Sequence, residues 1–319
     1  MTGNEPLYPV ELDAIDITPY RAGNTSVEYV TSLASGQAGP NVLISALVHG
    51  NEISGAIVLD ELMRQELRPA RGRLTLMFAN TAAYHHFDPE TPFASRFVEE
   101  DLNRVWHPAV LGGERDSVEC RRARELRPIV EQADFLLDLH SMQYPAPALM
   151  MVGPLHKGRT LAQQLGTPEY VVCDSGHAAG TRMRDYGGFG DSADAKAALL
   201  IESGQHWAAA TLATTRDTVF RFLREMELIS AAEAEPHLLA PPPSQTVVEV
   251  TDAVTVESTN FRFAKAYRGM ERITDTGTEI ARDGERSVRT PYGDCLLIMP
   301  SRRLKPGDTA VRFGRIVEN

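Results

Sequence analysis

Four ionisable side chains stand at the ends of three short apolar runs in this sequence. His49 and Glu52 follow the first run, His140 ends the second, and Glu202 ends the third. Two imidazoles and one carboxylate form the ligand set of a catalytic zinc ion, which keeps its fourth coordination position for water. Zinc lowers the pKa of that water to about 7, so an unligated carboxylate nearby can accept its proton. Glu202 is the candidate for this general base.

A polar loop between residues 84 and 110 supplies three further candidates. It contains Arg96, Asn103 and Arg104 among proline, histidine and aromatic residues. Long, weakly periodic loops inside a compact domain are often functional. We expect Arg96 to polarise the scissile carbonyl and to stabilise the oxyanion that forms from it. Asn103 and Arg104 can hold a substrate carboxylate through paired hydrogen bonds.

These candidates need a scaffold of buried strands whose carboxyl ends meet, which predicts an α/β fold. In open α/β sheets, ligands bind at the carboxyl ends of the strands. Asp138 precedes His140 by two residues, so it shares a strand face with His140 and can orient that ligand. The apolar runs typical of buried strands lie at residues 42–48, 74–79, 135–140 and 198–201. Further strands are predicted at 27–32, 149–152 and 170–173, and helices at 53–68, 158–166 and 211–232.

A change of pattern follows the prolines Pro241–Pro243. The helical period disappears there, and the residues beyond form short β-type runs between glycine and proline turns. We therefore predict two domains. Residues 1–240 form the α/β domain that carries the candidate site, and residues 241–319 form a small β domain.

Other polar features have simpler interpretations. The glycine-rich loop at 176–191 lacks the spacing of a phosphate-binding loop, so we expect a mobile active-site loop. His206 and Trp207 either line the pocket or pack beside it, and neither is assigned a catalytic role. A helix is predicted after the polar loop, and its basic side chains are interpreted as a solvent-exposed face. These side chains are Arg121, Arg122, Arg124 and Arg127. Six histidines are predicted to be surface or packing residues: His85, His86, His107, His156, His177 and His237.

The composition excludes several classes of partner and location. The 319 residues carry a net charge of −11, which argues against nucleic acid or an anionic membrane as a partner. No apolar run approaches the roughly 18 residues of a membrane span, and the N-terminus lacks the features of a signal peptide. Cys120, Cys173 and Cys295 are too few and too widely spaced for a disulfide framework. We expect a cytoplasmic protein with a small-molecule substrate, and homo-oligomers are compatible with the sequence.

In combination, these motifs resemble the succinylglutamate desuccinylase/aspartoacylase family, a branch of the zinc carboxypeptidase-like fold. The resemblance runs from residue 40 onwards. It implies a mixed central sheet flanked by helices, with a small C-terminal β domain. The segments that match in order and spacing are His49-Gly50-Asn51-Glu52, Arg96 to Arg104, Asp138-Leu139-His140 and Glu202-Ser203-Gly204.

The resemblance also implies an activity, namely zinc-dependent hydrolysis of the amide bond in a small N-acyl amino acid or a related N-acyl compound. It implies one zinc ion per chain as the cofactor. The roles it assigns are zinc binding to His49, Glu52 and His140, the general base to Glu202, carbonyl polarisation to Arg96, and carboxylate binding to Asn103 and Arg104.

The sequence does not define which residues complete the substrate pocket on the side away from the metal ligands. Family members that act on acidic acyl amino acids add an arginine shortly before the base and a tyrosine from the C-terminal domain. Arg182 and Arg184 are both candidates for that substrate-binding arginine, and Tyr267 and Tyr292 for the tyrosine. The segment 141–144 departs from both namesakes, which leaves the substrate undefined.

Two rival functions fit the same residues. A zinc carboxypeptidase acting on short peptides would use the same ligands, although a β domain after Pro243 would narrow access to its site. A non-catalytic protein could bind acyl amino acids through the zinc site, but it would not need Glu202 and Arg96. Comparing acetylated amino acids with dipeptides as substrates separates the two enzymes, and binding without turnover would support the receptor.

Overall fold

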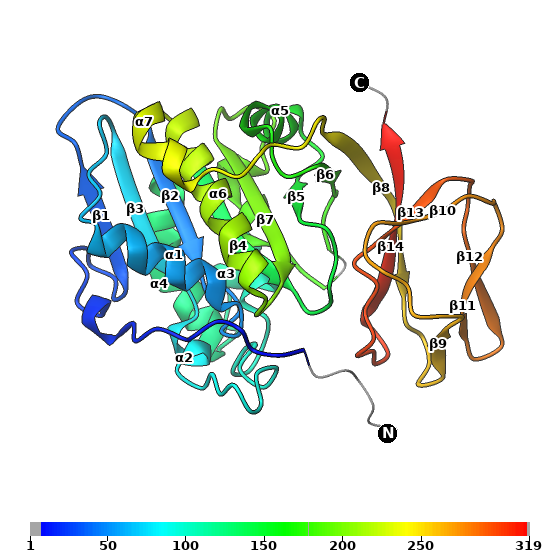
Figure 1. The fold of residues 1–319 in the computed structure, drawn as a ribbon. Coiled ribbons are helices and arrows are strands. Elements are labelled where there is room, and N and C mark those ends of the chain that lie inside the picture. The colour runs from blue at the N-terminus through cyan, green and yellow to red at the C-terminus, as the bar shows by residue number, and fades with distance from the viewer. Residues whose placement is uncertain (1–7, 178, 318–319) are drawn as a thin grey trace.

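The computed structural model describes residues 8–177 and 179–317, and a large mixed sheet runs across it (Figure 1). Within these residues the sheet has eleven strands, in the spatial order β1 (Val30–Ala34), β3 (Arg73–Phe78), β2 (Asn41–Ala46), β4 (Phe135–Met142), β7 (Ala197–Gln205), β5 (Leu149–Val152), β6 (Tyr170–Cys173), β8 (Thr246–Thr255), β14 (Thr309–Val317), β13 (Cys295–Ile298) and β10 (Glu271–Ile273). A smaller sheet consists of β9 (Phe261–Phe263), β11 (Glu279–Asp283) and β12 (Arg286–Arg289).

Helices cover both faces of the large sheet. The α-helices are α1 (Ile53–Arg64), α2 (Thr81–Tyr84), α3 (Pro108–Leu111), α4 (Val118–Gln132), α5 (His156–Leu165), α6 (Ala209–Glu225) and α7 (Ala231–Ala234). Short 3-10 segments are η1 (Thr18–Tyr20), η2 (Leu102–Arg104), η3 (Met183–Asp185), η4 (Gly187–Phe189) and η5 (Glu235–His237). This architecture confirms the predicted α/β class, with a mixed sheet flanked by helices and a small C-terminal sheet. No helix in the described ranges is both long and apolar enough to cross a membrane.

The centre of the sheet is parallel. β2 pairs in parallel with β3 and β4, and β4 pairs in parallel with β7. The carboxyl ends of β2, β4 and β7 therefore lie side by side at one end of the strands, which is where ligands bind in a doubly wound sheet. His140 on β4 and Glu202 on β7 are register partners near these carboxyl ends.

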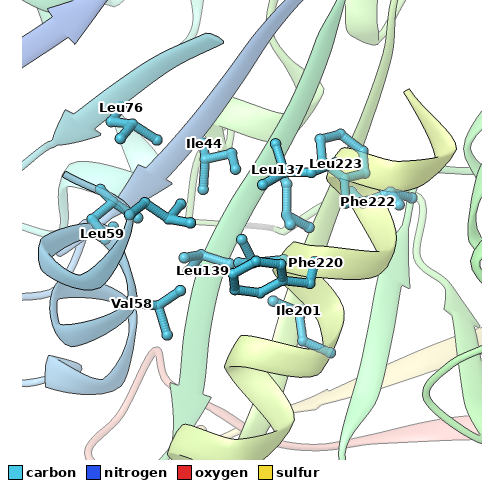
Figure 2. Close-up of a cluster of buried hydrophobic side chains, with 14 of the residues drawn as sticks. Ile44, Val58, Leu59, Leu76, Leu137, Leu139, Ile201, Phe220, Phe222 and Leu223 are labelled. Carbon is cyan, nitrogen blue, oxygen red and sulfur yellow. The ribbon is translucent and has the colours of Figure 1, made fainter. Parts of the chain in front are cut away.

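Two hydrophobic layers fix the strands in place. On one face, Val58 of α1 and Phe220 of α6 lie over β4, beside Leu137 and Leu139 (Figure 2). Both leucines are completely or almost completely buried, so truncating either to alanine should destabilise the fold by about 2–5 kcal/mol. On the other face α4 packs against the sheet through Leu126 and its apolar neighbours at helical spacing.

The helix predicted at 211–232 ends earlier than expected. α6 stops at Glu225, and Glu227 adopts a left-handed backbone conformation with φ 57° that no α-helix can accommodate. Tyr29 similarly has φ 61°, so β1 begins at Val30 and the strand predicted at 27–32 is shifted towards the C-terminus. Positive φ at an ordinary residue has no clear sequence signal, which is why both boundaries were misplaced.

The prediction of a solvated basic face on α4 was wrong for two of its arginines. Arg122 donates from Nε to the Ala79 carbonyl at 2.8 Å, and Arg124 donates from Nε to the Leu111 carbonyl at 2.9 Å. Both guanidiniums thus donate hydrogen bonds to backbone carbonyl groups outside α4. Arg121 and Arg127 are exposed, as predicted.

The large sheet continues beyond the predicted domain boundary. The boundary near residue 240 lies in the connection between η5 and β8, and β8 pairs in parallel with β6. β14 then pairs with β8 in antiparallel orientation along most of its length. The last quarter of the chain thus adds strands to the large sheet, and the division into two domains stays a prediction.

Candidate active site

The pleat of β4 separates its chemical side chains from its core side chains. Leu137 and Leu139 face the α1 and α6 layer, whereas Asp138 and His140 face the α4 side. Glu202 lies opposite His140 in the β4–β7 register. The alternation of residue types in the sequence is therefore what delivers these groups to one face of the sheet.

The three predicted metal ligands come together. Nδ1 of His49 lies 2.7 Å from Oε1 of Glu52, and Nδ1 of His140 lies 2.9 Å from Oε2 of the same carboxylate. All three residues are buried, and one ligand atom from each lies within 4.8 Å of the others. This donor set and its compactness suit a single divalent cation.

The outer nitrogens of both imidazoles are held by carboxylates. Nε2 of His49 lies 2.9 Å from Asp101, and Nε2 of His140 lies 2.9 Å from Asp138. A histidine that donates its outer N–H to a carboxylate keeps the inner lone pair for a metal ion. Asp138 was expected in this position. Asp101 was not assigned a role from the sequence, although it lies two residues before Asn103 in the polar loop.

Electrostatics couple these groups tightly. Burial raises the pKa of Glu52, but the positive charges of His49 and His140 outweigh it and lower that pKa well below its usual range. Burial lowers the pKa of His140, but Asp138 and Glu52 outweigh it and raise the pKa well above its usual range. A cation that binds here must therefore displace a proton from His140.

Arg96 lies at the rim of the ligand cluster. Its Nη2 is 3.0 Å from Nε2 of His49, and its Nη1 is 3.4 Å from Glu52. The loop reaches the cluster because Gly50 has no side chain: a Cβ there would lie 2.5 Å from the Ser95 carbonyl oxygen. The Gly50 N–H instead donates to the Arg96 carbonyl at 3.1 Å.

A buried carboxylate on α4 anchors the same loop. Glu119 is fully buried and accepts hydrogen bonds from the backbone N–H groups of Val98 at 2.7 Å and of Glu99 and Glu100 at 3.1 Å. The amide of Asn80 also donates to it, at 3.1 Å. Glu119 thus fixes the backbone between Arg96 and Asp101, and nothing local in the sequence points to this role.

A cavity of about 480 Å³ opens above the ligand cluster. Most of the predicted site residues line it, and so do several residues from the last third of the chain. Tyr267 lines the cavity, whereas Tyr292 does not and shares a 2.6 Å hydrogen bond with Thr251 instead. The predicted site residues on its wall are His49, Glu52, Arg96, Asn103, Arg104, His140, Arg182 and Glu202.

The structure separates the two arginine candidates. Arg182 lines the cavity, and its Nη2 donates to Asp174 at 2.7 Å. Arg184 is buried away from it, 2.9 Å from Asp185 and beside Gly153 in a separate small cavity. The short η3 turn directs the two side chains to different places, so we do not retain Arg184 as a substrate-binding residue.

Arg312 adds a positive charge that the sequence did not indicate. It comes from β14, and its Nε lies 3.4 Å from Asp174, the partner of Arg182. Arg104 lies on the same wall, and burial lowers its pKa to about 10. We define Arg104, Arg182 and Arg312 as the cationic wall of the cavity.

The glycine-rich loop contributes His177, which was predicted to be a surface or packing residue and which lines the cavity. Burial, followed by the charge of Arg104, lowers the pKa of His177 to about 3, so the ring is neutral at physiological pH. The loop approaches Arg104 closely because Gly180, with φ 144°, has no Cβ to meet the Arg104 carbonyl. The mobility of this loop stays a prediction, and Ala178 lies outside the described residues.

Glu202 is buried beside the ligand cluster but is not part of it. Burial, reinforced by the charge of Glu52, raises its pKa to about 8. Its Oε2 makes no hydrogen bond to any described residue. A carboxyl group whose pKa lies near neutrality can both accept and return a proton under physiological conditions.

His206 lines the cavity, which settles the alternative left open by the sequence. Its Nδ1 lies 2.7 Å from the hydroxyl of Ser141, and burial lowers its pKa to about 3. The N–H of Ser141 in turn donates to Glu52 at 3.0 Å. Trp207 packs beside the cavity, where its Nε1 donates to the Asn51 carbonyl at 3.0 Å.

Comparison with known proteins agrees with this geometry. Residues 38–226, more than half of the chain, match the model of the succinylglutamate desuccinylase/aspartoacylase catalytic domain. The chain belongs to this family. A succinylglutamate desuccinylase from Pseudomonas syringae pv. tomato is 33% identical over 112 residues, which cover 33% of this chain and 30% of that relative. The matched region therefore spans less than a third of that curated relative.

Solved structures show the same fold. A succinylglutamate desuccinylase from Vibrio parahaemolyticus superposes with a TM-score of 0.67 at 15% identity, over 91% of this chain and 87% of the other. An ectoine utilization protein from Ruegeria pomeroyi, solved with a bound product, gives a TM-score of 0.62 at 19% identity, over 90% and 89%. At these identities the likeness concerns the fold alone.

Proposed function

We propose that the protein is a zinc-dependent amidohydrolase that cleaves the amide bond of a small N-acyl amino acid or a related N-acyl compound. The observation that carries the proposal is the convergence of three metal-ligating side chains with the unligated Glu202 and with Arg96 in one cavity. Family membership supports the same reaction class, because the curated relatives are named as desuccinylases.

The residues present fit one zinc ion per chain. His49, Glu52 and His140 would hold it, since their inner donor atoms already converge and the outer imidazole nitrogens are fixed by Asp101 and Asp138. Two histidines and one glutamate are a frequent catalytic zinc set. When bound, zinc supplies a Lewis acid that acidifies water and polarises a carbonyl group.

In this proposal Glu202 carries out the proton transfers. Its carboxylate takes a proton from the attacking water and then delivers it to the leaving amine nitrogen. Burial suits both steps, because a pKa of about 8 keeps either protonation state accessible near neutral pH. Arg96, beside Glu52, is placed to hold the carbonyl oxygen as it gains negative charge.

The cationic wall would hold a substrate carboxylate. Asn103 uses its Oδ1 to accept the Met183 N–H at 2.9 Å, which leaves its Nδ2 as a donor towards the cavity wall that it shares with Arg104. Nη1 of Arg182 makes no hydrogen bond to any described residue. Guanidinium and amide donors of this kind bind carboxylates through charge-assisted hydrogen bonds.

The carboxypeptidase alternative is less well supported. Residues from the last third of the chain, among them Tyr267, Met299 and Arg312, close the cavity beside the ligand cluster. A volume of about 480 Å³ accommodates a small acylated amino acid and leaves little room for an extended peptide. The non-catalytic alternative does not explain a buried, unligated Glu202 beside the metal ligands.

Amine release from a panel of N-acyl amino acids and dipeptides tests the proposal. We expect the zinc-loaded protein to hydrolyse at least one N-acyl amino acid and to hydrolyse dipeptides far more slowly. Faster release from dipeptides would establish the carboxypeptidase. Stoichiometric binding of an acyl amino acid, without turnover of any compound, would establish the receptor.

A further inference from the structure

The cavity has an apolar wall that the proposed reaction does not require. Five of its lining residues, Met142, Ala146, Met151, Leu200 and Met299, belong to one contiguous hydrophobic cluster between the central strands and the last third of the chain. We call these five residues the methionine wall. Methionine side chains are flexible and polarisable, so such a surface adapts to hydrocarbon groups of different shape.

The methionine wall adjoins the reacting groups. Met142 follows His140 by two residues on β4, and Leu200 precedes Glu202 by two residues on β7. Alternate residues of a strand share a face, so both apolar side chains lie on the same face as the catalytic groups. Met151 of β5 is the register partner of Leu200 and extends the apolar surface across the next strand.

The cationic wall is positively charged, in contrast to the apolar methionine wall. Its three guanidiniums face three carboxylates: Asp174 contacts both Arg182 and Arg312, Asp185 lies 3.9 Å from Arg182, and Asp101 lies 3.8 Å from Arg104. The cationic wall therefore suits a substrate carboxylate, whereas a carboxylate against the methionine wall would lose its hydration without gaining a partner there.

We propose, on the basis of the proposed function, that the substrate is an N-acyl amino acid with a single carboxylate and one hydrocarbon group. The carboxylate binds the cationic wall, the amide lies between Arg96 and Glu202, and the hydrocarbon group lies on the methionine wall. The hydrocarbon is either the acyl chain or the amino-acid side chain. Compounds with more than one carboxylate, such as N-acetylaspartate and N-succinylglutamate, are therefore poor substrates of this chain.

Two substrate series at constant carboxylate count test the proposal. One series lengthens the acyl group from acetyl to hexanoyl on a single amino acid, and the other enlarges the side chain of acetylated amino acids from glycine to leucine and phenylalanine. We expect kcat/KM to rise by about 3- to 4-fold per buried methylene in one series, which identifies the end that contacts the wall. N-Succinylglutamate and N-acetylaspartate should rank below the best hydrocarbon substrate by at least tenfold.

Variants of the wall separate specificity from folding. Met299 and Met270 belong to the same cluster, but only Met299 lines the cavity. Met299→Gln should reduce the ratio of kcat/KM for the hydrocarbon substrate over the acetylglycine reference by about 5- to 10-fold. Met270→Gln, the matched control for a polar atom in this cluster, should leave that ratio unchanged. Equal effects of both variants would overturn the role of the wall.

Binding to Glu202→Gln, measured by calorimetry with the same compounds, gives a test that does not depend on turnover. Preferential binding of the hydrocarbon compounds supports the substrate class even if no compound is hydrolysed, in which case only the proposed catalytic function fails. Faster turnover or tighter binding of N-acetylaspartate or N-succinylglutamate overturns the substrate class and leaves the hydrolase proposal intact.

Discussion

On one side of the cavity, the reacting groups stand at the carboxyl ends of three neighbouring parallel strands, whereas the other side is assembled from distant strands and loops. His49 follows β2, and His140 and Glu202 lie near the carboxyl ends of β4 and β7. Asp101 and Asp138 hold the two imidazoles at 2.9 Å. Arg312 and Met299 come from the last third of the chain and meet the cavity through long-range packing. We call the first the ligand side, because it carries the predicted metal ligands, and the second the C-terminal side. In the proposed mechanism the ligand side carries out the reaction, and the C-terminal side selects the substrate.

This contrast has a kinetic consequence. Substitutions on the ligand side, where groups act on the reacting atoms, should lower kcat. Substitutions on the C-terminal side, where groups contact only the bound substrate, should raise KM and alter specificity. The substitutions considered next, from the largest expected effect to the smallest, either sharpen this division or break it.

Glu202→Gln should have the largest effect. Removing the general base should reduce kcat by about 10²- to 10⁴-fold while the bound zinc is retained, because Glu202 is not a ligand. Steady-state kinetics and metal analysis on the same preparation check both parts. Undiminished turnover by this variant would remove Glu202 from the mechanism.

Glu119→Gln should impair catalysis without contacting substrate. A glutamine turns an N–H group towards the backbone donors of Val98 to Glu100, so the loop that carries Arg96 should shift, and kcat should fall by about 10- to 100-fold. Zinc content should be unchanged, and cleavage of the loop by proteases should accelerate. Glu125→Gln, an exposed position on the same helix, is the matched control. A normal kcat in Glu119→Gln would refute the positioning role.

Arg312→Gln should act on binding. Loss of one charge-assisted contact should raise KM by about tenfold and leave kcat within a factor of two or three. Arg315→Gln on the same strand is the control, since that guanidinium lies over the Tyr292 ring and not at the cavity. A fall in kcat with unchanged KM would break the division between the two sides.

The last expected effect concerns the stability of the zinc-stripped protein and leaves catalysis aside. Because burial raises the pKa of Glu202 from 4.5 to about 8, the folded chain holds this proton more tightly than the unfolded chain does. The stabilisation is complete below pH 4.5 and is lost as pH rises to 8. Glu202→Gln cannot ionise, so its stability relative to the parent should increase by roughly 3 kcal/mol between pH 5 and pH 8. A constant difference in chemical denaturation would contradict the raised pKa.

The sequence predicted the ligand side well because its determinants are local. A buried apolar run predicts a parallel strand, and the residue that ends the run then lies at the ligand-binding edge, as found for His140 and Glu202. The same alternation placed Asp138 behind His140. The α/β class followed from these strands together with the amphipathic helices between them.

The remaining site residues depend on contacts that no local pattern encodes. Glu119 acts through a loop 19 to 21 residues away, and Arg312 meets Asp174 across the strand order of the sheet. The choice between Arg182 and Arg184 depends on the directions that side chains take in a 3-10 turn. Long-range packing decides these positions, so only the structure could assign them.

The central claim is that one zinc ion bound by His49, Glu52 and His140 makes this chain a hydrolase. Its most direct test is the metal content of the purified protein by elemental mass spectrometry, with amine release from an N-acyl amino acid measured on the same sample before and after chelation. We predict one zinc per chain, loss of activity on chelation, and recovery when zinc is returned. Well under one zinc per chain, with full activity after chelation, would contradict the account.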